Sequence, residues 1–458
     1  MEGQGAAHGF NRRALFWICV LALVTAAMSF SLRTGASGAI KEALFDPINL
    51  AGSGEMIATA LGNSFLGFAL SLLVICPFLD LIGAKRVILL ASACFIAGPL
   101  LIIAAPMTGN GVVGMVSLGM ILCGVGWGAT EAAINPVTAV LYPDDKTHRL
   151  NVLHAWWPAG IVAGGLLSIV IFQTLDMDWR IAIALIVIPG VIFGVWTLGQ
   201  TFPKTESTVL GVSFPAMMAE PFRRPSFWIF AAIMFLTASA ELAPGSWVDV
   251  ALTQTVGMPG ILVLIYVSAI MFVMRHFAGA LAHRISDMGL LCVCTIPAAI
   301  GLYLLSHASS PAAAFLAATL WAVGVAFMWP TMLAAVAHRY PRGGPWTIGL
   351  VGFAGAMAIW FVLPRLGAIY DQAKLEAAGG EEAFAALQTG PELSGVLAHA
   401  AETSFQTVAV IPVILFVIFG AVWLVERKHR PGRPPRRSGR PGDACARPAT
   451  RRRRSRTG

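Results

Sequence analysis

Apolar residues in this chain come in repeated blocks of about 20, and most of the charged residues lie between the blocks. The first block, residues 14–32, is followed by Arg33, and the last block is followed by Glu426. The hydrocarbon core of a bilayer is about 30 Å thick, and about 20 helical residues are needed to cross it. The pattern therefore predicts an all-α integral membrane protein that crosses the bilayer many times.

The composition excludes a soluble protein. Hydrophobic residues make up 57% of the chain and charged residues only 12%, against about 25% charged in a soluble domain. The net charge of +8 is misleading, because 13 Lys and Arg residues follow Glu426. Without them the body holds 18 basic and 22 acidic residues and is mildly acidic.

Residues 427–458 form a Pro-, Arg- and Gly-rich segment with one acidic residue, Asp443. Such a composition cannot bury a core, so it predicts a disordered basic tail. We expect this tail to contact anionic lipid headgroups in the cytoplasm. A nucleic-acid partner is not expected.

The apolar blocks predict twelve spans. Their expected ranges are 14–36, 56–79, 86–106, 112–141, 149–174, 179–200, 225–250, 259–282, 288–306, 311–338, 346–370 and 404–426. The longest inner loop, 201–224, separates six spans from six. This predicts an N-terminal six-helix bundle over 1–200, a cytoplasmic linker, and a C-terminal six-helix bundle over 225–426.

Lys and Arg gather in alternate loops, for example at Arg12, Lys146 and Arg223. The opposite loops are poor in basic residues, and the longest, 371–403, is acidic. Positive charge marks the cytoplasmic side of a membrane protein. The sequence therefore predicts a multi-pass protein of the cell (inner or plasma) membrane with both termini in the cytoplasm.

The loop after the second span contains Asp80, Gly83, Lys85 and Arg86. With the twelve spans and their six-plus-six division, these residues resemble the major facilitator superfamily over nearly the whole chain except the tail. Cys76, Leu81 and Ala84 depart from the family's loop motif. The resemblance implies that the four matching residues gate the inner side. The alternative for Asp80 is a helix-capping carboxylate in a tight turn.

Ionisable groups within membrane spans are costly and face a cavity or a partner. The candidates are Arg33, Glu131, His154, Glu241, Arg275 and Arg365. Glu131 is the strongest of them, because helical spacing places it on one face with Trp127 and Asn135.

Glu131, Asn135 and Pro136 resemble the fourth helix of the fucose–proton symporter group of that superfamily. The resemblance implies that Glu131 takes part in proton coupling and that Asn135 lies at the substrate site. The alternative is a structural carboxylate bonded to its neighbours.

The fifth span begins Asn151-Val-Leu-His154-Ala-Trp156-Trp157-Pro158. The symporter group has a substrate-binding Gln at the position of His154 and a substrate-binding Asn at that of Trp157. Both departures change the expected substrate contacts. His154 can hydrogen-bond a hydroxyl or a carboxylate, and Trp157 can stack on a sugar ring. The alternative for both side chains is packing between helices.

Arg33 stands where the symporter group has an acidic residue. Arginine does not deprotonate, so it cannot carry a proton. It can bind a carboxylate or phosphate, or it can snorkel to the outer interface. If Arg33 reaches Glu131, an anionic solute could compete for Arg33 and release Glu131 to take a proton.

In the second half, Glu241 precedes Pro244-Gly245, which we expect to break the helix and to free backbone groups toward a site. Glu241 is a second candidate for proton coupling, and with Arg275 and Trp329 it is assigned to substrate binding. The alternative is an ion pair between Glu241 and Arg275.

The leading function is a secondary active transporter that moves a small polar solute, a sugar or sugar acid, by alternating access with proton symport. Glu131 favours the symporter. Arg33 and Arg275 favour the alternative, an exchanger or effluxer of organic or inorganic anions. A transporter-like receptor is a further alternative. We expect no enzyme activity, because the intramembrane His154 is isolated and an embedded enzyme needs clustered His and Asp or Glu. We expect no cofactor or metal, because the cysteines have no metal-site context. The nucleotide-binding loop Gly-x-x-x-x-Gly-Lys-Ser/Thr is missing, so ATP drive would need another subunit. We expect a monomer.

Overall fold

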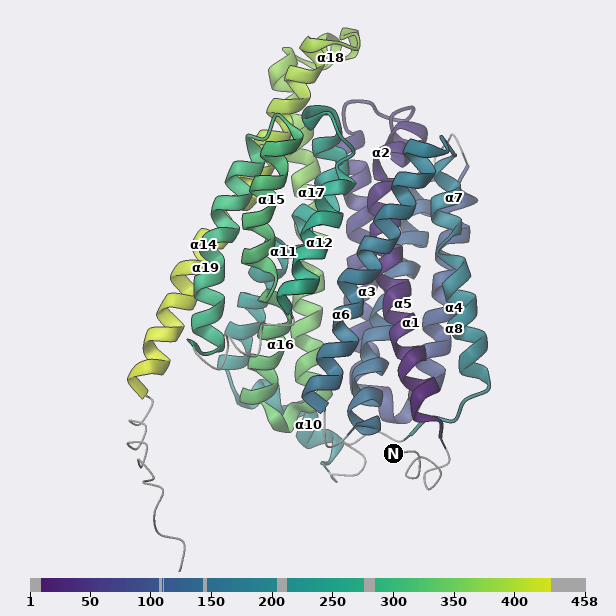
Figure 1. Cartoon of the computed structure of the whole chain (residues 1–458), viewed down its shortest axis with the longest axis vertical. Helices are drawn as coiled ribbons and strands as arrows, with labels where there is room; N and C mark the ends of the chain where they lie inside the picture. The colour runs from purple at the N-terminus through teal and green to yellow at the C-terminus, as the bar shows by residue number, and fades with distance from the viewer. Residues whose placement is uncertain are drawn as a thin grey trace, which may run out of the picture.

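The computed structural model describes residues 10–106, 109, 111–142, 146–203, 212–275 and 285–429, apart from a few side chains such as that of Asp80. Every regular element in these ranges is a helix. Eleven helices are long and apolar enough to cross a membrane, and a twelfth, α12, is apolar and described over Ile261–Arg275. They run side by side along the long axis of the molecule (Figure 1). The expected all-α membrane fold with twelve spans is confirmed.

The first six spans are formed by eight elements. They are α1 (Arg12–Gly35), α3 (Ser53–Ile82), α4 (Ala84–Ile103), α5 (Gly111–Leu141), α6 (Lys146–Ile169) with its π-helical end (Val170–Thr174), and the pair α7 (Trp179–Ala184) and α8 (Val187–Leu198). The last six are formed by α11 (Ser226–Val256), α12, α14 (Asp287–Ser306), the pair α15 (Pro311–Val325) and α16 (Met328–Arg339), α17 (Gly344–Ala378) and α19 (Pro391–His429). Among the described residues, five short helices lie between spans: α2 (Ser37–Ile40), a π-helix (Lys41–Phe45), α10 (Phe214–Arg223), a 3₁₀ helix (Pro341–Gly343) and α18 (Glu381–Ala386).

Local residues explain where several helices begin. The side chain of Asn11 accepts a hydrogen bond from the Ala14 amide at 3.0 Å and caps α1. Ser310 caps α15, and Pro311 occupies its first turn, where no amide partner is needed. These caps satisfy backbone donors that the first helical turn leaves unpaired.

Residues 371–403, expected to be the longest outer loop, are mostly helical. The eleventh span continues to Ala378, and the last helix begins at Pro391. The segment is rich in Ala, Leu and Glu, which are good helix formers. It reverses at Gly379 and Gly380, whose φ angles of 85° and 123° are accessible to glycine. The result is a helical hairpin that projects beyond the other helices at α18 (Figure 1).

The expected break at Pro244-Gly245 is wrong, because α11 is continuous from Ser226 to Val256. Pro244 has no amide hydrogen and leaves the carbonyl of Ala240, four residues earlier, without its helical donor. The Trp321 indole donates to that carbonyl at 3.2 Å. A neighbouring helix thus supplies the missing hydrogen bond, which is how proline is tolerated in membrane helices.

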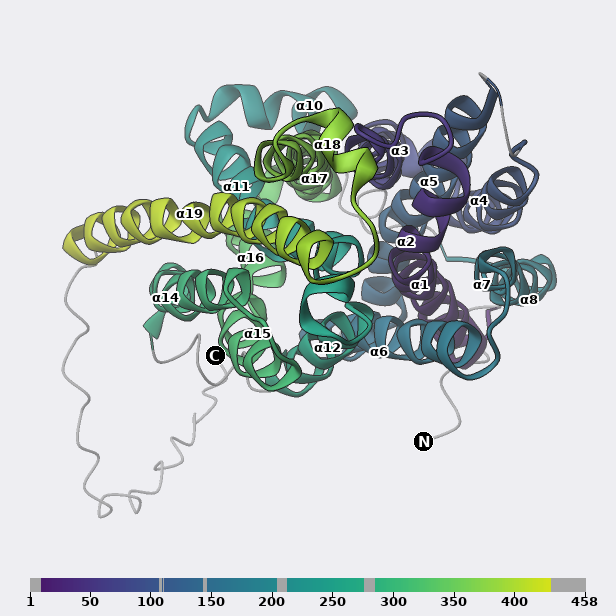
Figure 2. The same cartoon turned by 90° about the horizontal axis from the view of Figure 1, so that it is seen from above.

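The helices up to residue 203 lie on one side of the molecule and those from residue 212 lie on the other (Figure 2). Close helix crossings need glycine. A Cβ at Gly124 of α5 would overlap the Ser64 carbonyl of α3. Backbones that approach so closely gain packing contacts within a membrane.

Two carboxylates join the sides at the end of the molecule away from the N-terminus. Asp249 of α11 accepts from the Gly38 amide at 3.2 Å, and Asp371 of α17 accepts from the Glu55 amide at 2.7 Å. In each case a carboxylate from the C-terminal part of the chain accepts from an amide in the first turn of a helix in the N-terminal part.

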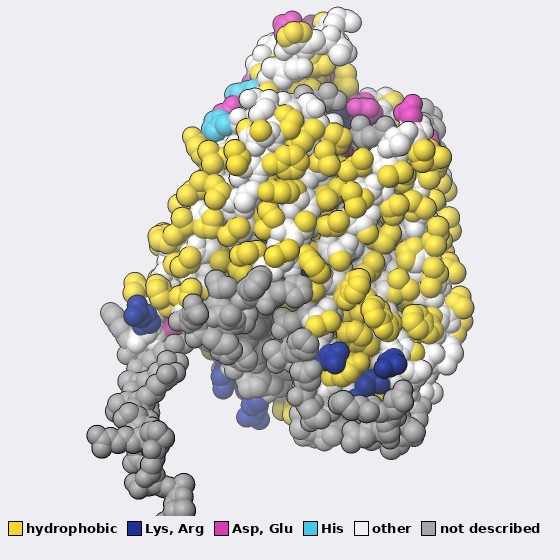
Figure 3. Space-filling model, viewed as in Figure 1, with side chains coloured by type: hydrophobic (Ala, Val, Ile, Leu, Met, Phe, Trp, Pro, Cys, Tyr) yellow, Lys and Arg dark blue, Asp and Glu magenta, His cyan; other side chains and the backbone are white. Residues whose placement is uncertain are grey.

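The visible surface separates by chemistry (Figure 3). Hydrophobic side chains cover the middle of the molecule. Most of the visible Lys and Arg lie near the end that holds the N-terminus, whereas most of the visible Asp and Glu and the visible His lie near the end that holds α18. A belt of this kind suits contact with lipid tails.

Candidate solute and coupling site

Glu131, Asn135 and His154 form a hydrogen-bonded chain between α5 and α6. The Asn135 amide nitrogen lies 3.3 Å from Glu131 Oε2 and 3.1 Å from the Glu131 carbonyl. His154 Nε2 lies 2.7 Å from Asn135 Oδ1. Since the Asn135 oxygen can only accept, His154 Nε2 must carry the hydrogen. The chain therefore runs from His154 through Asn135 to the carboxylate of Glu131, and all three side chains keep some exposed surface.

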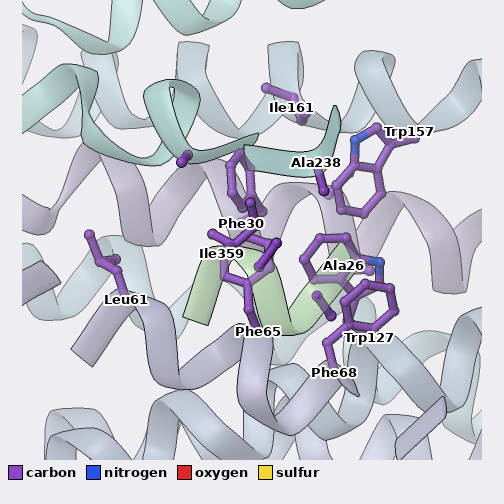
Figure 4. Packing of buried hydrophobic residues seen from close by; sticks show 14 of the residues in the cluster. Ala26, Phe30, Leu61, Phe65, Phe68, Trp127, Trp157, Ile161, Ala238 and Ile359 are labelled. Atoms are coloured by element: carbon purple, nitrogen blue, oxygen red, sulfur yellow. The ribbon is translucent and has the colours of Figure 1, made fainter. Parts of the chain in front are cut away.

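Trp127 and Trp157, from the same two helices, belong to a group of packed aromatic side chains with Phe68 (Figure 4). The Trp127 ring, one turn before Glu131, lies between Phe68 and Trp157. Its centroid is 4.2 Å from that of Phe68, with planes 1° apart, and 4.6 Å from that of Trp157, with planes 20° apart. Trp329 extends the stack from the C-terminal part of the chain, with a centroid 6.2 Å from that of Phe68. The rings thus connect the two sides of the molecule.

Trp157 is only 8% exposed, and one face of its ring is covered by Trp127. In this conformation the side chain packs between helices, which is the alternative that the sequence left open. Its stacking on a solute ring stays a prediction.

Glu241 and Arg275 form a buried ion pair between α11 and α12, with Arg275 Nη2 3.2 Å from Glu241 Oε1. The other Glu241 oxygen accepts from the Trp329 backbone amide at 3.0 Å. Arg275 Nε donates to the Ala326 carbonyl at 3.1 Å. The pairing considered from the sequence is present, and it also reaches the backbone of the tenth span.

Arg275 also connects this ion pair with the hydrogen-bonded residues Glu131, Asn135 and His154. Its positive charge interacts with both Glu131 and His154 across the two sides of the molecule. Glu131, Asn135, His154, Trp157, Glu241, Arg275 and Trp329, all selected from the sequence, therefore belong to one central region.

Arg33 lies elsewhere. It is 2% exposed and donates to the Ser29 carbonyl at 2.9 Å, while Nη1 lies 3.5 Å from the Met120 sulfur. Met120 precedes Glu131 by eleven residues of the same helix, which is about 16 Å along the axis. Arg33 is thus neither a snorkelling residue nor a neighbour of Glu131. The arginine whose charge reaches Glu131 is Arg275. Arg365 is exposed and lies over the Phe361 ring.

The expected gating residues lie at the turn between α3 and α4. Gly83 has a φ of 86°, which favours glycine at this reversal. Lys85 Nζ donates to the Leu198 carbonyl at 2.8 Å, and Arg86 donates to the Ile82 carbonyl at 3.4 Å. The side chain of Asp80 lies outside the described part of the chain.

Sequence reasoning missed Phe68, Asp249 and Asp371. Phe68 carries no signal, because phenylalanine is common in apolar spans. Asp249 stands at the end of an expected span and could have been found by the cost of an intramembrane carboxylate. Asp371 was assigned to a loop, since the helical extension of the eleventh span was not expected.

The sequence model of the Major Facilitator Superfamily matches residues 18–364. No curated protein matches the chain. Among solved structures, a D-xylose–proton symporter has a TM-score of 0.69 at 14% identity, with 87% of this chain and 97% of that chain covered.

A bacterial homologue of the human lysosomal transporter Spinster, in an inward-facing and unoccupied conformation, also has a TM-score of 0.69, at 16% identity over 92% of this chain and 98% of that one. A human organic anion transporter has a TM-score of 0.63 at 14% identity, with 89% and 99% covered. At these identities the structural likeness shows the fold alone. With the match to the family model over most of its length, the chain belongs to the Major Facilitator Superfamily, whose members are membrane transporters and not enzymes.

Proposed function

We propose that this protein is a proton-coupled symporter of a small polar solute, such as a sugar or a sugar acid. The observation that carries the proposal is the chain from His154 through Asn135 to Glu131, which lies beside stacked tryptophan rings. A carboxylate at the end of such a chain can exchange a proton, while the amide, imidazole and rings offer hydrogen bonds and flat faces to a polar solute.

The direction of the hydrogen bonds links protonation to binding. The ionised Glu131 is the better acceptor for the Asn135 amide, because bonds to a charged acceptor are stronger. Protonation of Glu131 weakens the hydrogen bond that it accepts from the Asn135 amide. Asn135 and His154 then become available to solute hydroxyls. Proton and solute would in this way be taken up together.

We further propose that the bundles 1–200 and 225–426 rock against each other, with both termini in the cytoplasm. The basic end of the molecule near the N-terminus supports this orientation (Figure 3). Asp249 and Asp371 would then close the outer side in this conformation. We assign the loop Asp80–Arg86 to the inner gate. We expect the tail to contact lipid headgroups and the protein to act as a monomer.

A second candidate is an exchanger of organic anions. It is favoured by Arg33, which is 2% exposed and has no carboxylate within 4 Å in the described part of the chain. A buried cation of this kind could receive an anionic group.

Purified protein in lipid vesicles tests the proposal. A thermal-shift screen of sugars, sugar acids and small anions first identifies ligands. A ligand is then added outside vesicles that contain a pH-sensitive dye, and symport should acidify the lumen as solute enters. Solute entry that is stimulated by anions inside and leaves the pH unchanged would favour the exchanger. Binding without any flux would favour a receptor.

A further inference from the structure

The tenth span is interrupted at its middle, between α15 and α16, at Ala326 and Phe327. Pro330 follows Ala326 by four residues. In a regular helix the amide of that residue would donate to the Ala326 carbonyl, but proline has no amide hydrogen. The interruption also leaves the Trp329 amide at the first turn of α16, where helices have unpaired donors.

The Glu241–Arg275 pair satisfies both of these backbone groups. Arg275 Nε donates to the Ala326 carbonyl at 3.1 Å, and Glu241 Oε2 accepts from the Trp329 amide at 3.0 Å. The two side chains also bond to each other at 3.2 Å. A donor and an acceptor from two other spans therefore bridge the interruption.

We propose that Glu241 and Arg275 act as a splint across the interruption of the tenth span and position Trp329. In this conformation they are positioning residues, because they act on the solute region through the backbone of α16. If the proposed symport of a sugar acid is correct, its carboxylate competes for Arg275, withdraws the donor from Ala326 and frees α16 to bend.

The Trp329 ring contacts residues of other spans, so a movement of α16 would change those contacts. Its ring extends the stack at Phe68, with planes 28° apart. On another side it lies against Gly355 of α17, where a Cβ would stand 2.7 Å from Trp329 Cζ3. A shift of α16 would thus alter the stacking of Trp329 on Phe68, which joins the two sides of the molecule.

Pro244 shows that the splint is a separate device and not a general consequence of proline. Pro244 frees the Ala240 carbonyl, and a neutral indole, that of Trp321, satisfies it while α11 stays continuous. An indole has no charge to be competed for. A charged pair at the Ala326 carbonyl can respond to an anion or to a proton.

A double-mutant cycle on thermal unfolding in detergent tests the splint without transport. Arg275→Ala should lower the Tm by about 5 °C, because it leaves the Ala326 carbonyl without a donor and the buried Glu241 without its cation. Pro330→Ala restores an amide for that carbonyl, so Arg275→Ala should cost clearly less on this background. Pro297→Ala in α14 is the matched control. On that background Arg275→Ala should lower the Tm by as much as it does in the wild type. An equal cost on all three backgrounds would overturn the splint.

A spectroscopic measurement covers the case in which Arg275→Ala does not fold. The protein is labelled with 5-fluorotryptophan, and the ¹⁹F signal of Trp329 is assigned by its loss in Trp329→Phe. Glu241→Gln should move this signal. Glu376→Gln is the same change at an exposed position of α17 and should leave it in place. A Trp329 signal that Glu241→Gln leaves unmoved would refute the inference. Both readouts are independent of vesicle flux, which alone tests the proposed function.

Discussion

Glu131 and Glu241 both lie well inside membrane spans, and their surroundings differ. Glu131 of α5 bonds to Asn135 on its own helix, makes no ion pair within 4 Å among the described residues, and keeps some exposed surface. Glu241 of α11 is 5% exposed, pairs with Arg275 and accepts from the Trp329 amide. The same side chain is therefore accessible in one half and committed to backbone and cation in the other.

This difference indicates a role in proton coupling for Glu131 and a role in stabilising the structure for Glu241. A carboxylate that is bound by a neutral amide leaves no cation without its ion-pair partner when it is removed. A carboxylate paired with a buried arginine leaves an uncompensated charge when it is removed. We therefore expect changes at Glu131 to alter coupling and changes at Glu241 to alter stability. Four predictions test this contrast.

The largest expected effect is on proton coupling. Glu131→Gln keeps an amide in place of the carboxylate but cannot exchange a proton. Uphill uptake driven by a pH gradient should be abolished, while downhill exchange of labelled solute continues. Both are measured in vesicles with equal amounts of inserted protein. Uphill uptake at the wild-type rate would show that Glu131 takes no part in proton coupling, and it would favour the anion exchanger.

The next effect is on stability. Glu241→Ala leaves both Arg275 and the Trp329 amide without their partner, so its Tm should fall by about 5 °C or more. Glu131→Ala removes only a bond to Asn135 and should lower the Tm by about 2 °C or less. Thermal unfolding of the two variants in the same detergent compares them directly. Equal losses would mean that the two carboxylates are structurally equivalent.

A smaller effect is expected from the aromatic stack. Trp127→Leu leaves a gap between Phe68 and Trp157, so the Trp157 ring loses the contact that orients it. Solute affinity should weaken roughly tenfold, which corresponds to about 1.4 kcal/mol. Trp247→Leu, at a buried tryptophan of α11 outside this stack, is the control and should retain affinity. Titration calorimetry of each variant gives the values.

The smallest effect is expected at Arg33. Its guanidinium contacts Ser29 and Met120, about 16 Å along the helix from Glu131. Arg33→Gln should therefore change the affinities for a sugar and for its acid by the same factor, within about twofold. A binding assay with the two ligands side by side measures the ratio. Selective loss of the acid would instead support the exchanger and give Arg33 an anion-binding role.

Much of the candidate site could be selected from the sequence. Glu131, Asn135, His154, Glu241 and Arg275 were found because polar residues within spans are costly and rarely accidental. Phe68 could not be found in the same way, since an aromatic residue in an apolar span has no distinguishing cost. The position of Arg33 could not be found either, because spacing along one helix does not show which neighbouring helix that residue faces.

The sequence by itself determined the twelve spans and the all-α fold, since a bilayer leaves helices as the structure that such apolar blocks can form. Only the tertiary structure decided whether the helix is interrupted near Pro244 and near Pro330. Pro244 was expected to break its helix and does not, because the Trp321 indole reaches the carbonyl that it frees. Pro330 lies at a true interruption, and the charged pair Glu241–Arg275 bridges it. A freed backbone group takes its partner from another span, and that partner is far away in the sequence.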